Sequence, residues 1–288
     1  MSARLRIAVQ KSGRLADKSL ELIAAAGLSV VKGANELLYR IENAPIDLLR
    51  VRDDDIPTFV EDGVADFGII GRNVLEERSA GVSKFVMALG FGKCDLKIAA
   101  PIGFDYHGAR SLQSLRIATS YPRTLARFLE SNGVEAEIVT MRGAVEVAPR
   151  LKLAQVICDL VSTGATLEAN GLAAVDTVMK SEAVLIRAPT KCEPELEHVA
   201  DSLVQRFRGV IASRGAKYVM MNAPRAVLPQ ISAILPGADA PTVTPLAGRD
   251  DAVAVHAVCQ ESVFWETLEQ LKAAGASSIL VLPIEKMM

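Results

Sequence analysis

Residues 156–167 constrain the fold of this chain more than any other segment. They combine an apolar strand pattern over 156–161, interrupted by Asp159, with five small or hydroxyl-bearing residues over 162–166. A helical pattern follows over 167–174. A strand, a small polar turn and a helix start leave the first helical N–H groups free, and the helix dipole favours an anion there. The segment therefore predicts a phosphate site, with Gly164 allowing close backbone approach and Asp159 able to accept hydrogen bonds from sugar hydroxyls.

The same pattern has a simpler interpretation, in which the Ser and Thr side chains only cap the helix. The turn does not end in the Gly-Lys-Ser/Thr of a nucleotide-binding P-loop, so that kind of site is excluded. The local pattern alone leaves the helix cap and the phosphate site both open.

Longer stretches around this turn point to one family. The chain reads EVAP at 146–149 and ICDLVSTGATLEANG at 157–171. Together these resemble the signature of the ATP phosphoribosyltransferases. The resemblance extends to KSGRL at 11–15, LRVRDDDIP at 49–57, DFGIIG at 66–71 and GASSILVLPIEK at 275–286, and so covers nearly the whole chain.

The resemblance implies a reaction. Enzymes of this family join ATP, through its N1 atom, to 5-phosphoribosyl 1-pyrophosphate (PRPP) and release pyrophosphate, which is the first step of histidine biosynthesis. It also implies Mg²⁺ held mainly by substrate phosphates, with no protein metal ligands assigned. Feedback inhibition by L-histidine and a homo-oligomer, from dimer to hexamer, are expected as well.

The resemblance also implies a set of site residues. The expected catalytic residues are Arg52 and Asp159. The expected PRPP site is Asp159, Ser162, Thr163, Gly164, Ala165 and Thr166, and the expected ATP site is Lys11, Gly13, Arg14, Asp66 and Glu146.

Several of these positions keep an ordinary structural alternative. Lys11 and Arg14 are solvated loop cations on that alternative, although the family match favours binding. Asp66 either shapes the nucleotide site or caps a turn. Glu146 either contacts the adenine amino group or caps a helix over 148–153.

Two other features near the site have competing explanations. Residues 53–55, three Asp in a row, suggest a metal site, but we expect one of them to cap the helix that contains Pro57. Tyr121 and Phe91 are either stacking surfaces for adenine or core residues.

The order of predicted elements divides the chain into three parts. The strand at 115–118, LRIA, echoes LRIA at 5–8, and each is followed by a polar turn and a helix. This predicts an α/β fold with two similar lobes around a cleft, the type II periplasmic-binding-protein-like arrangement. We expect the first lobe at 1–92, completed by 181–208, and the second at 93–180.

The last part, 211–288, shows a β-α-β-β-α-β order that predicts a ferredoxin-like α+β domain. The family resemblance makes this an ACT-like regulatory domain. The loops between its first helix and the following strands are the candidate histidine site, with Leu235, Pro236, Gly237 and Thr242 as its residues.

Composition restricts the location and the partners. The formal net charge of the 288 residues is −2, and no apolar run approaches the roughly 18–20 residues of a membrane span, so neither nucleic acid nor membrane is expected as a partner. Four scattered cysteines argue against a disulfide framework or a zinc site. Together with the lack of a signal-peptide pattern, they indicate a cytoplasmic protein.

Two positions depart from the family signature. It usually has Gly where Lys152 stands and Asp where Gln155 stands. Either change weakens PRPP binding if its position contacts the substrate. The rival functions are a non-catalytic metabolite sensor and a different phosphoribosyltransferase. The combination of the 162–166 loop with Arg52 favours the first enzyme over the sensor.

Overall fold

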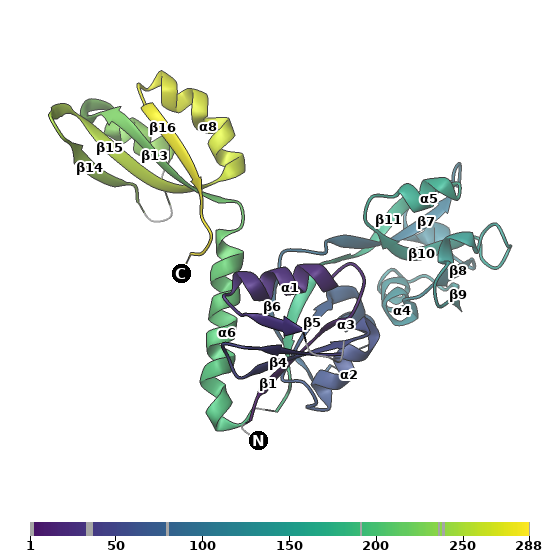
Figure 1. Ribbon diagram of the computed structural model, residues 1–288. Helices are drawn as coiled ribbons and strands as arrows, with labels where there is room; N and C mark the ends of the chain where they lie inside the picture. The colour runs from purple at the N-terminus through teal and green to yellow at the C-terminus, as the bar shows by residue number, and fades with distance from the viewer. Residues whose placement is uncertain are drawn as a thin grey trace. The chain divides into compact units, whose positions relative to one another are not determined.

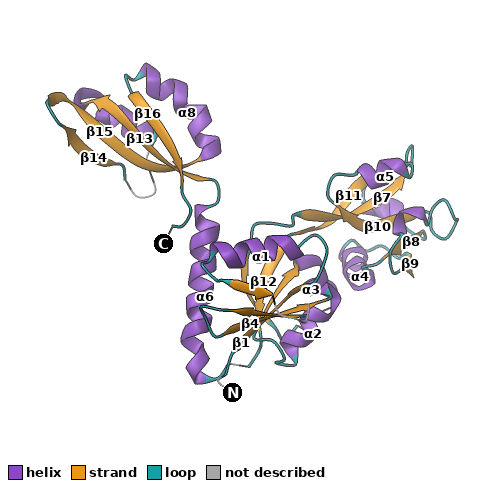
Figure 2. Cartoon of the chain, viewed as in Figure 1, coloured by secondary structure: helices purple, strands orange, loops and turns teal. Residues whose placement is uncertain are grey.

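The computed structural model describes residues 3–32, 37–78, 81–190, 192–235, 237 and 240–287. Its contacts divide the chain into a first unit, Met1–Asp201, and a second unit, Ser202–Met288. Three β-sheets of seven, five and four strands form the framework, and helices pack on them (Figure 1). Figure 2 shows this alternation of strands and helices, which confirms the α/β class. Within the described residues, no helix is long and apolar enough to cross a membrane.

The seven-stranded sheet, with its helices, is the first lobe. Its strand order is β2-β3-β4-β1-β5-β12-β6, and β1 is parallel to both β4 and β5. The carboxyl ends of these three strands therefore meet at one edge, where α/β folds bind ligands. The core includes Ile7, Leu48 and Ile69, which are fully buried. The elements are β1 (Leu5–Gln10), α1 (Ala16–Ala25), β2 (Val30–Lys32), β3 (Leu38–Ile41), β4 (Ile46–Val51), α2 (Ile56–Glu61), β5 (Phe67–Gly71), α3 (Arg72–Arg78), β6 (Lys84–Ala88) and β12 (Ala183–Arg187).

The five-stranded sheet, with its helices, is the second lobe. Its order is β11-β7-β10-β8-β9, and β10 is parallel to β8 and antiparallel to β7. Ile98, Ile117 and Val156 lie in its core without solvent exposure. The elements are β7 (Cys94–Pro101), β8 (Arg116–Thr119), α4 (Pro122–Ser131), β9 (Glu137–Thr140), β10 (Val156–Val161), α5 (Ala165–Ala169) and β11 (Leu172–Ser181).

The chain passes from the first sheet to the second between β6 and β7, and returns between β11 and β12. Two α/β lobes joined by such a pair of crossings form the periplasmic-binding-protein-like arrangement expected from the sequence. Helix α6 (Pro194–Ser213) then runs from the first unit into the second.

The second unit contains a four-stranded antiparallel sheet with the order β14-β15-β13-β16. Numbered along the chain, this order is 2-3-1-4, which is that of a ferredoxin-like domain. Val219, Val253 and Leu271 belong to its core. The elements are β13 (Ala216–Pro224), α7 (Leu228–Ile234), β14 (Thr242–Leu246), β15 (Arg249–Gln260), α8 (Glu261–Ala273) and β16 (Ser277–Pro283).

Two helices expected from the sequence are wrong, one in its extent and one in its existence. The helix expected over 167–174 is α5, which begins at Ala165 and ends at Ala169. Gly171 has a φ of +71°, a left-handed conformation that ends the helix before β11 begins. The helix expected over 148–153 is absent, because the described chain there forms a short 3-10 helix, Val145–Val147, followed by turns.

Candidate active site

The turn after β10 has the backbone of an anion cradle. Gly164 has a φ of +87° and stands directly before α5, and a side chain at this position would meet no neighbouring atom. The glycine is therefore required by its backbone conformation and not by lack of space. Within the described chain, the backbone N–H groups of Ser162, Thr163 and Gly164 have no protein partner. They remain available to an anionic ligand.

A small cavity of about 170 Å³ lies over this turn. It brings Asp159 and Glu146 together with the predicted PRPP residues. Ala165 is the one predicted PRPP residue that does not line it. The lining residues are Glu146, Asp159, Leu160, Val161, Ser162, Thr163, Gly164, Thr166 and Leu167.

Asp159 is held in an environment that disfavours its charge. Burial raises the pKa of its carboxyl, the backbone N–H of Leu160 lowers it by donating a hydrogen bond of 2.8 Å, and the Glu146 carboxylate raises it again. A ligand with sugar hydroxyls would give Asp159 hydrogen-bond donors in addition to the backbone N–H of Leu160.

The loop after β1 provides the facing cations. Gln10 accepts a hydrogen bond from the backbone N–H of Leu15 at 2.9 Å, which closes the loop that contains Lys11 and Arg14. Gly13 has a φ of +109°, and a Cβ there would lie 2.9 Å from the Gln10 amide nitrogen. The loop is therefore built around Gly13.

The loop is also fixed to the neighbouring strand. Arg50 Nη2 donates to the Lys11 carbonyl oxygen at 2.6 Å, and the Lys11 backbone N–H donates to the Val51 carbonyl oxygen at 2.7 Å. Arg50 therefore supports the loop from β4, a role that its place within a strand gave no reason to predict.

The two loops meet across the lobes. Arg14 Nη1 donates a long hydrogen bond of 3.4 Å to Ser162 Oγ. This contact brings a predicted ATP residue to a predicted PRPP residue although 148 positions separate them.

A larger cavity of about 670 Å³ opens beside these loops. Both lobes contribute to it, and its volume is in the range of small-molecule sites. It contains Arg52, as expected for a phosphate-contacting arginine, and also Arg142, which has no motif to mark it. The lining residues are Arg52, Asp53, Asp54, Asp55, Val74, Glu77, Arg78, Ser120, Tyr121, Pro122, Thr140, Met141 and Arg142.

Tyr121 and Phe91, equal candidates in the sequence, separate in the structure. Phe91 is buried in the core, whereas Tyr121 lines the larger cavity. Burial raises the pKa of Tyr121 to about 12, with the charges of Asp159 and Asp53 adding to the increase and Arg14 opposing it. The phenol therefore lies within electrostatic range of site residues from both lobes.

The expectation that one of the three aspartates caps α2 is met in position but not in the side-chain hydrogen bond. Asp55 is the N-cap residue of α2 without a side-chain capping hydrogen bond, although Pro57 does occupy the first turn. The three carboxylates line the larger cavity instead, and burial raises the pKa of Asp53. Asp54 also forms an ion pair of 3.6 Å with Arg78. Among the described residues, no group of three His, Cys, Asp or Glu gathers as a metal site.

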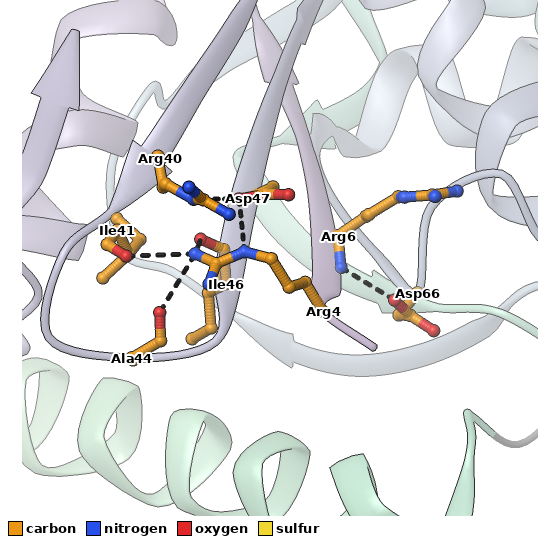
Figure 3. Close-up of polar contacts among 8 residues, drawn as sticks. All are labelled: Arg4, Arg6, Arg40, Ile41, Ala44, Ile46, Asp47 and Asp66. Carbon is orange, nitrogen blue, oxygen red and sulfur yellow. Dashed lines mark hydrogen bonds and ion pairs between the residues drawn. The ribbon is translucent and has the colours of Figure 1, made fainter. Parts of the chain in front are cut away.

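Asp66, one of the predicted ATP residues, lies apart from the loop that contains Lys11. Figure 3 shows its carboxylate beside Arg6, whose backbone N–H donates to Asp66 Oδ2 at 2.8 Å. Asp66 therefore lies before β5, near the start of β1, whereas Lys11 follows the end of β1. The five steps along the chain from Arg6 to Lys11 span about 17 Å and separate the two edges of the sheet. Asp66 therefore closes a turn at the edge of the sheet opposite Lys11, while its assignment to the ATP site stays a prediction.

Leu235, one of the predicted histidine-site residues, is buried in the second unit. The residue is 1% exposed and belongs to the core of the second unit, so its side chain packs inside the domain. Gly237 has a φ of +76°, and Thr242 is exposed at the start of β14. Pro236 lies outside the described residues.

The two departures from the family signature lie far from the phosphate cradle. Lys152 and Gln155 precede β10, and the cradle follows it, so the six residues of β10, about 20 Å, separate them. Gln155 Oε1 accepts a hydrogen bond from the backbone N–H of Arg116 at 2.7 Å, which is a structural role. Lys152 has a φ of +58°, a conformation that suits the Gly of the signature.

These features define a class of protein. A phosphate cradle on one α/β lobe faces a cationic loop on another, and a ferredoxin-like domain follows. These are the features of a two-lobed α/β protein that binds anionic ligands between its lobes, with an added small domain.

Comparison with known proteins identifies the family. The family model for ATP phosphoribosyltransferase matches residues 52–209, and the model for the HisG C-terminal domain matches 213–286. An ATP phosphoribosyltransferase of Maricaulis maris (strain MCS10) is 54% identical over 293 residues, with 100% of each chain covered. The chain belongs to the ATP phosphoribosyltransferase family and is a pentosyltransferase of histidine biosynthesis.

A solved structure agrees with this assignment. The ATP phosphoribosyltransferase (HisG:HisZ) complex from Thermotoga maritima contains a chain that is 26% identical, with a TM-score of 0.59. The match covers 71% of this chain and 98% of that one.

Proposed function

We propose that the chain transfers the phosphoribosyl group of PRPP to N1 of ATP, giving N1-(5-phosphoribosyl)-ATP and pyrophosphate. The contact between Arg14 and Ser162 is the observation that carries this proposal, because it places a cationic loop against a phosphate cradle. PRPP has a phosphate at one end of its ribose and a pyrophosphate at the other. Such a ligand needs an anion site on each side, and the two loops provide them.

Each group then has a distinct role. The loop at 162–166 holds the 5-phosphate, and Asp159 accepts hydrogen bonds from the ribose hydroxyls. Arg52, Lys11 and Arg14 neutralise oxygens of the pyrophosphate or the triphosphate. The lone pair of adenine N1 forms a bond to the anomeric carbon, and the bond to pyrophosphate breaks with its electron pair on the leaving oxygen. No general base is needed, so catalysis consists of positioning and charge stabilisation.

The larger cavity is the proposed ATP site. Tyr121 offers a ring for adenine, and Arg52 and Arg142 offer cations for the phosphates. The amino group of adenine is adjacent to N1, so a residue that recognises it must lie close to the ribose of PRPP. Glu146 lies beside Asp159 and meets this requirement, and the alternative helix for it to cap does not form.

Mg²⁺ fits this site as an ion carried by the substrate phosphates. Mg²⁺ commonly keeps several waters and uses few protein carboxylates. Asp53 and Asp54 line the larger cavity and are the carboxylates that would complete its coordination. When bound, Mg²⁺ offsets the negative charge of the phosphates.

The proposals for regulation and for oligomeric assembly rest on the family resemblance. We propose that L-histidine inhibits the enzyme through the ferredoxin-like domain, near Gly237 and Thr242, and that the chain forms homo-oligomers between dimer and hexamer. The four free cysteines support a cytoplasmic location.

Binding of PRPP to two variants of the cradle tests the site assignment. Thr166→Ala removes a hydroxyl donor to the phosphate, and Gly164→Val places a β-branched residue at a positive φ. We expect each to raise the Kd for PRPP about tenfold or more in calorimetric titration, because hydrogen bonds to charged groups contribute roughly 1.5–3 kcal/mol. Unchanged PRPP affinity in folded variants would refute the assignment.

A further inference from the structure

Helix α3 carries two buried polar side chains to which the proposed chemistry assigns no role, although Glu77 is among the residues that line the larger cavity. Asn73 is 2% exposed and Glu77 is 3% exposed. They are four residues apart and so share one face of the helix. Buried polar groups need hydrogen-bonding partners, and the partners of this pair show what the face contacts.

Glu77 caps a helix of the other lobe. Its carboxylate accepts hydrogen bonds from the backbone N–H of Arg123 at 3.0 Å and from the backbone N–H and the hydroxyl of Thr124, both at 2.8 Å. Arg123 Nη1 also donates to the Glu77 carbonyl oxygen at 3.1 Å. Tyr121, the N-cap residue of α4, makes no side-chain capping bond. A carboxylate from the first lobe therefore satisfies the first turn of α4 in the second lobe.

Asn73 extends the same contact. Ser181 Oγ donates to Asn73 Oδ1 at 2.8 Å, so the amide group is oriented with Nδ2 toward Tyr121, to whose hydroxyl it donates at 3.1 Å. The preceding Gly71 makes room for this arrangement, because a Cβ there would lie 2.4 Å from Asn73 Oδ1. Ser181 is the last residue of β11, where the chain returns toward the first sheet.

These contacts determine where the substrate groups of the second lobe lie. Tyr121 lines the larger cavity directly before α4 begins, and β8, which leads to α4, is paired with β10, which leads to the phosphate cradle. Movement of α4 relative to α3 would carry the cradle away from Arg52 and Lys11. We propose that Glu77 is a positioning residue of the transfer reaction, which holds the cradle of the second lobe in register with the cations of the first. This inference rests on the proposed function.

The adjacent residue provides a matched control. Glu76 pairs with Arg127 at 3.3 Å between the same two helices, but the two side chains are 40% and 54% exposed. Exposed ion pairs contribute little, whereas Glu77 makes charge-assisted hydrogen bonds away from water. Glu77→Gln and Glu76→Gln are the same chemical change at neighbouring positions. Glutamine has one acceptor oxygen, and its NH₂ group would face backbone N–H donors at position 77.

Titration with two ligands tests the proposal. PRPP spans both lobes, whereas ribose 5-phosphate occupies the cradle and Asp159. We expect Glu77→Gln to raise the Kd for PRPP at least tenfold while the Kd for ribose 5-phosphate changes less than twofold. Glu76→Gln should leave both within twofold. A general loss of structure would weaken the binding of both ligands together. Equal increases in the two Kd values of Glu77→Gln, or an unchanged Kd for PRPP, would therefore overturn the proposal.

A second pair of variants decides the matter if Glu77→Gln does not fold. Thr124→Val removes one hydrogen-bond donor to Glu77 and should raise the Kd for PRPP threefold or more. Thr124→Ser keeps the hydroxyl and should bind PRPP with the wild-type affinity. Identical behaviour of the two variants would contradict the proposal. Failure of the wild-type chain to bind PRPP would overturn the proposed function, and this inference with it.

Discussion

At the scale of single residues, Asp159 shows how function opposes stability. Its carboxyl is partly buried beside Glu146, and its pKa is raised above the ordinary value for an aspartate. The folded state therefore binds a proton more tightly than the unfolded state. Stability conferred by this group is present at low pH and is lost as the pH rises through the raised pKa.

The substitution Asp159→Asn should separate the effect of this carboxylate on stability from its effect on catalysis. We expect the free energy of unfolding at pH 7 to rise by roughly 0.5–2 kcal/mol, the usual gain from relieving such a site, while kcat/KM for PRPP falls. The gain should shrink as the pH is lowered through the raised pKa, because the protonated aspartate is also neutral. Denaturant unfolding at several pH values measures it. A variant less stable than wild type at pH 7 would contradict this assignment.

At the scale of elements, the turn before β10 shows why glycine suits position 152 of the family signature, where this chain has Lys. Lys152 has a φ of +58°, which costs an L-residue about 1–2 kcal/mol, whereas glycine adopts it freely. Glycine also loses more conformational entropy on folding, about 0.5–1 kcal/mol. We expect Lys152→Gly to raise the free energy of unfolding by up to about 1 kcal/mol. Because β10 separates this turn from the cradle, kcat/KM should not change, and a tenfold change would show that the turn affects the site.

Elements were predictable where local pattern and chain order agree. The strands β1, β4 and β10 and the ferredoxin-like order follow from apolar runs bounded by turn residues. The short pair of β2 and β3 was missed, because β2 has only three largely exposed residues and the alternation of β3 extends over only four. The helix expected over 148–153 failed because apolar spacing does not reveal the left-handed conformations of Ala144 and Lys152.

The candidate site was predictable in part for a related reason. The cradle at 162–166 and Arg14 lie directly after strands, where sequence order alone places ligand groups. Glu77 and Asn73 act through contacts between lobes, and the sequence contains no short-range signal for those contacts. The position of Asp66 just before β5 could not be predicted, because a short motif does not show which edge of a sheet its first residue occupies.

At the scale of the whole molecule, the two units suggest separable functions. The solved Thermotoga maritima chain matches 71% of this chain over 98% of its own length. We expect removal of residues from about 211 onward to abolish inhibition by L-histidine while PRPP binding persists. Inhibition curves for a folded truncated protein measure this. Full inhibition in that protein would place the histidine site in the first unit.

Formation of product from ATP and PRPP in the presence of Mg²⁺, with and without L-histidine, tests the central claim most directly. We predict that N1-(5-phosphoribosyl)-ATP and pyrophosphate appear in equal amounts, only when both substrates are present, and that histidine suppresses both. A folded protein that binds both substrates and forms neither product would contradict the claim that the two loops assemble a catalytic site.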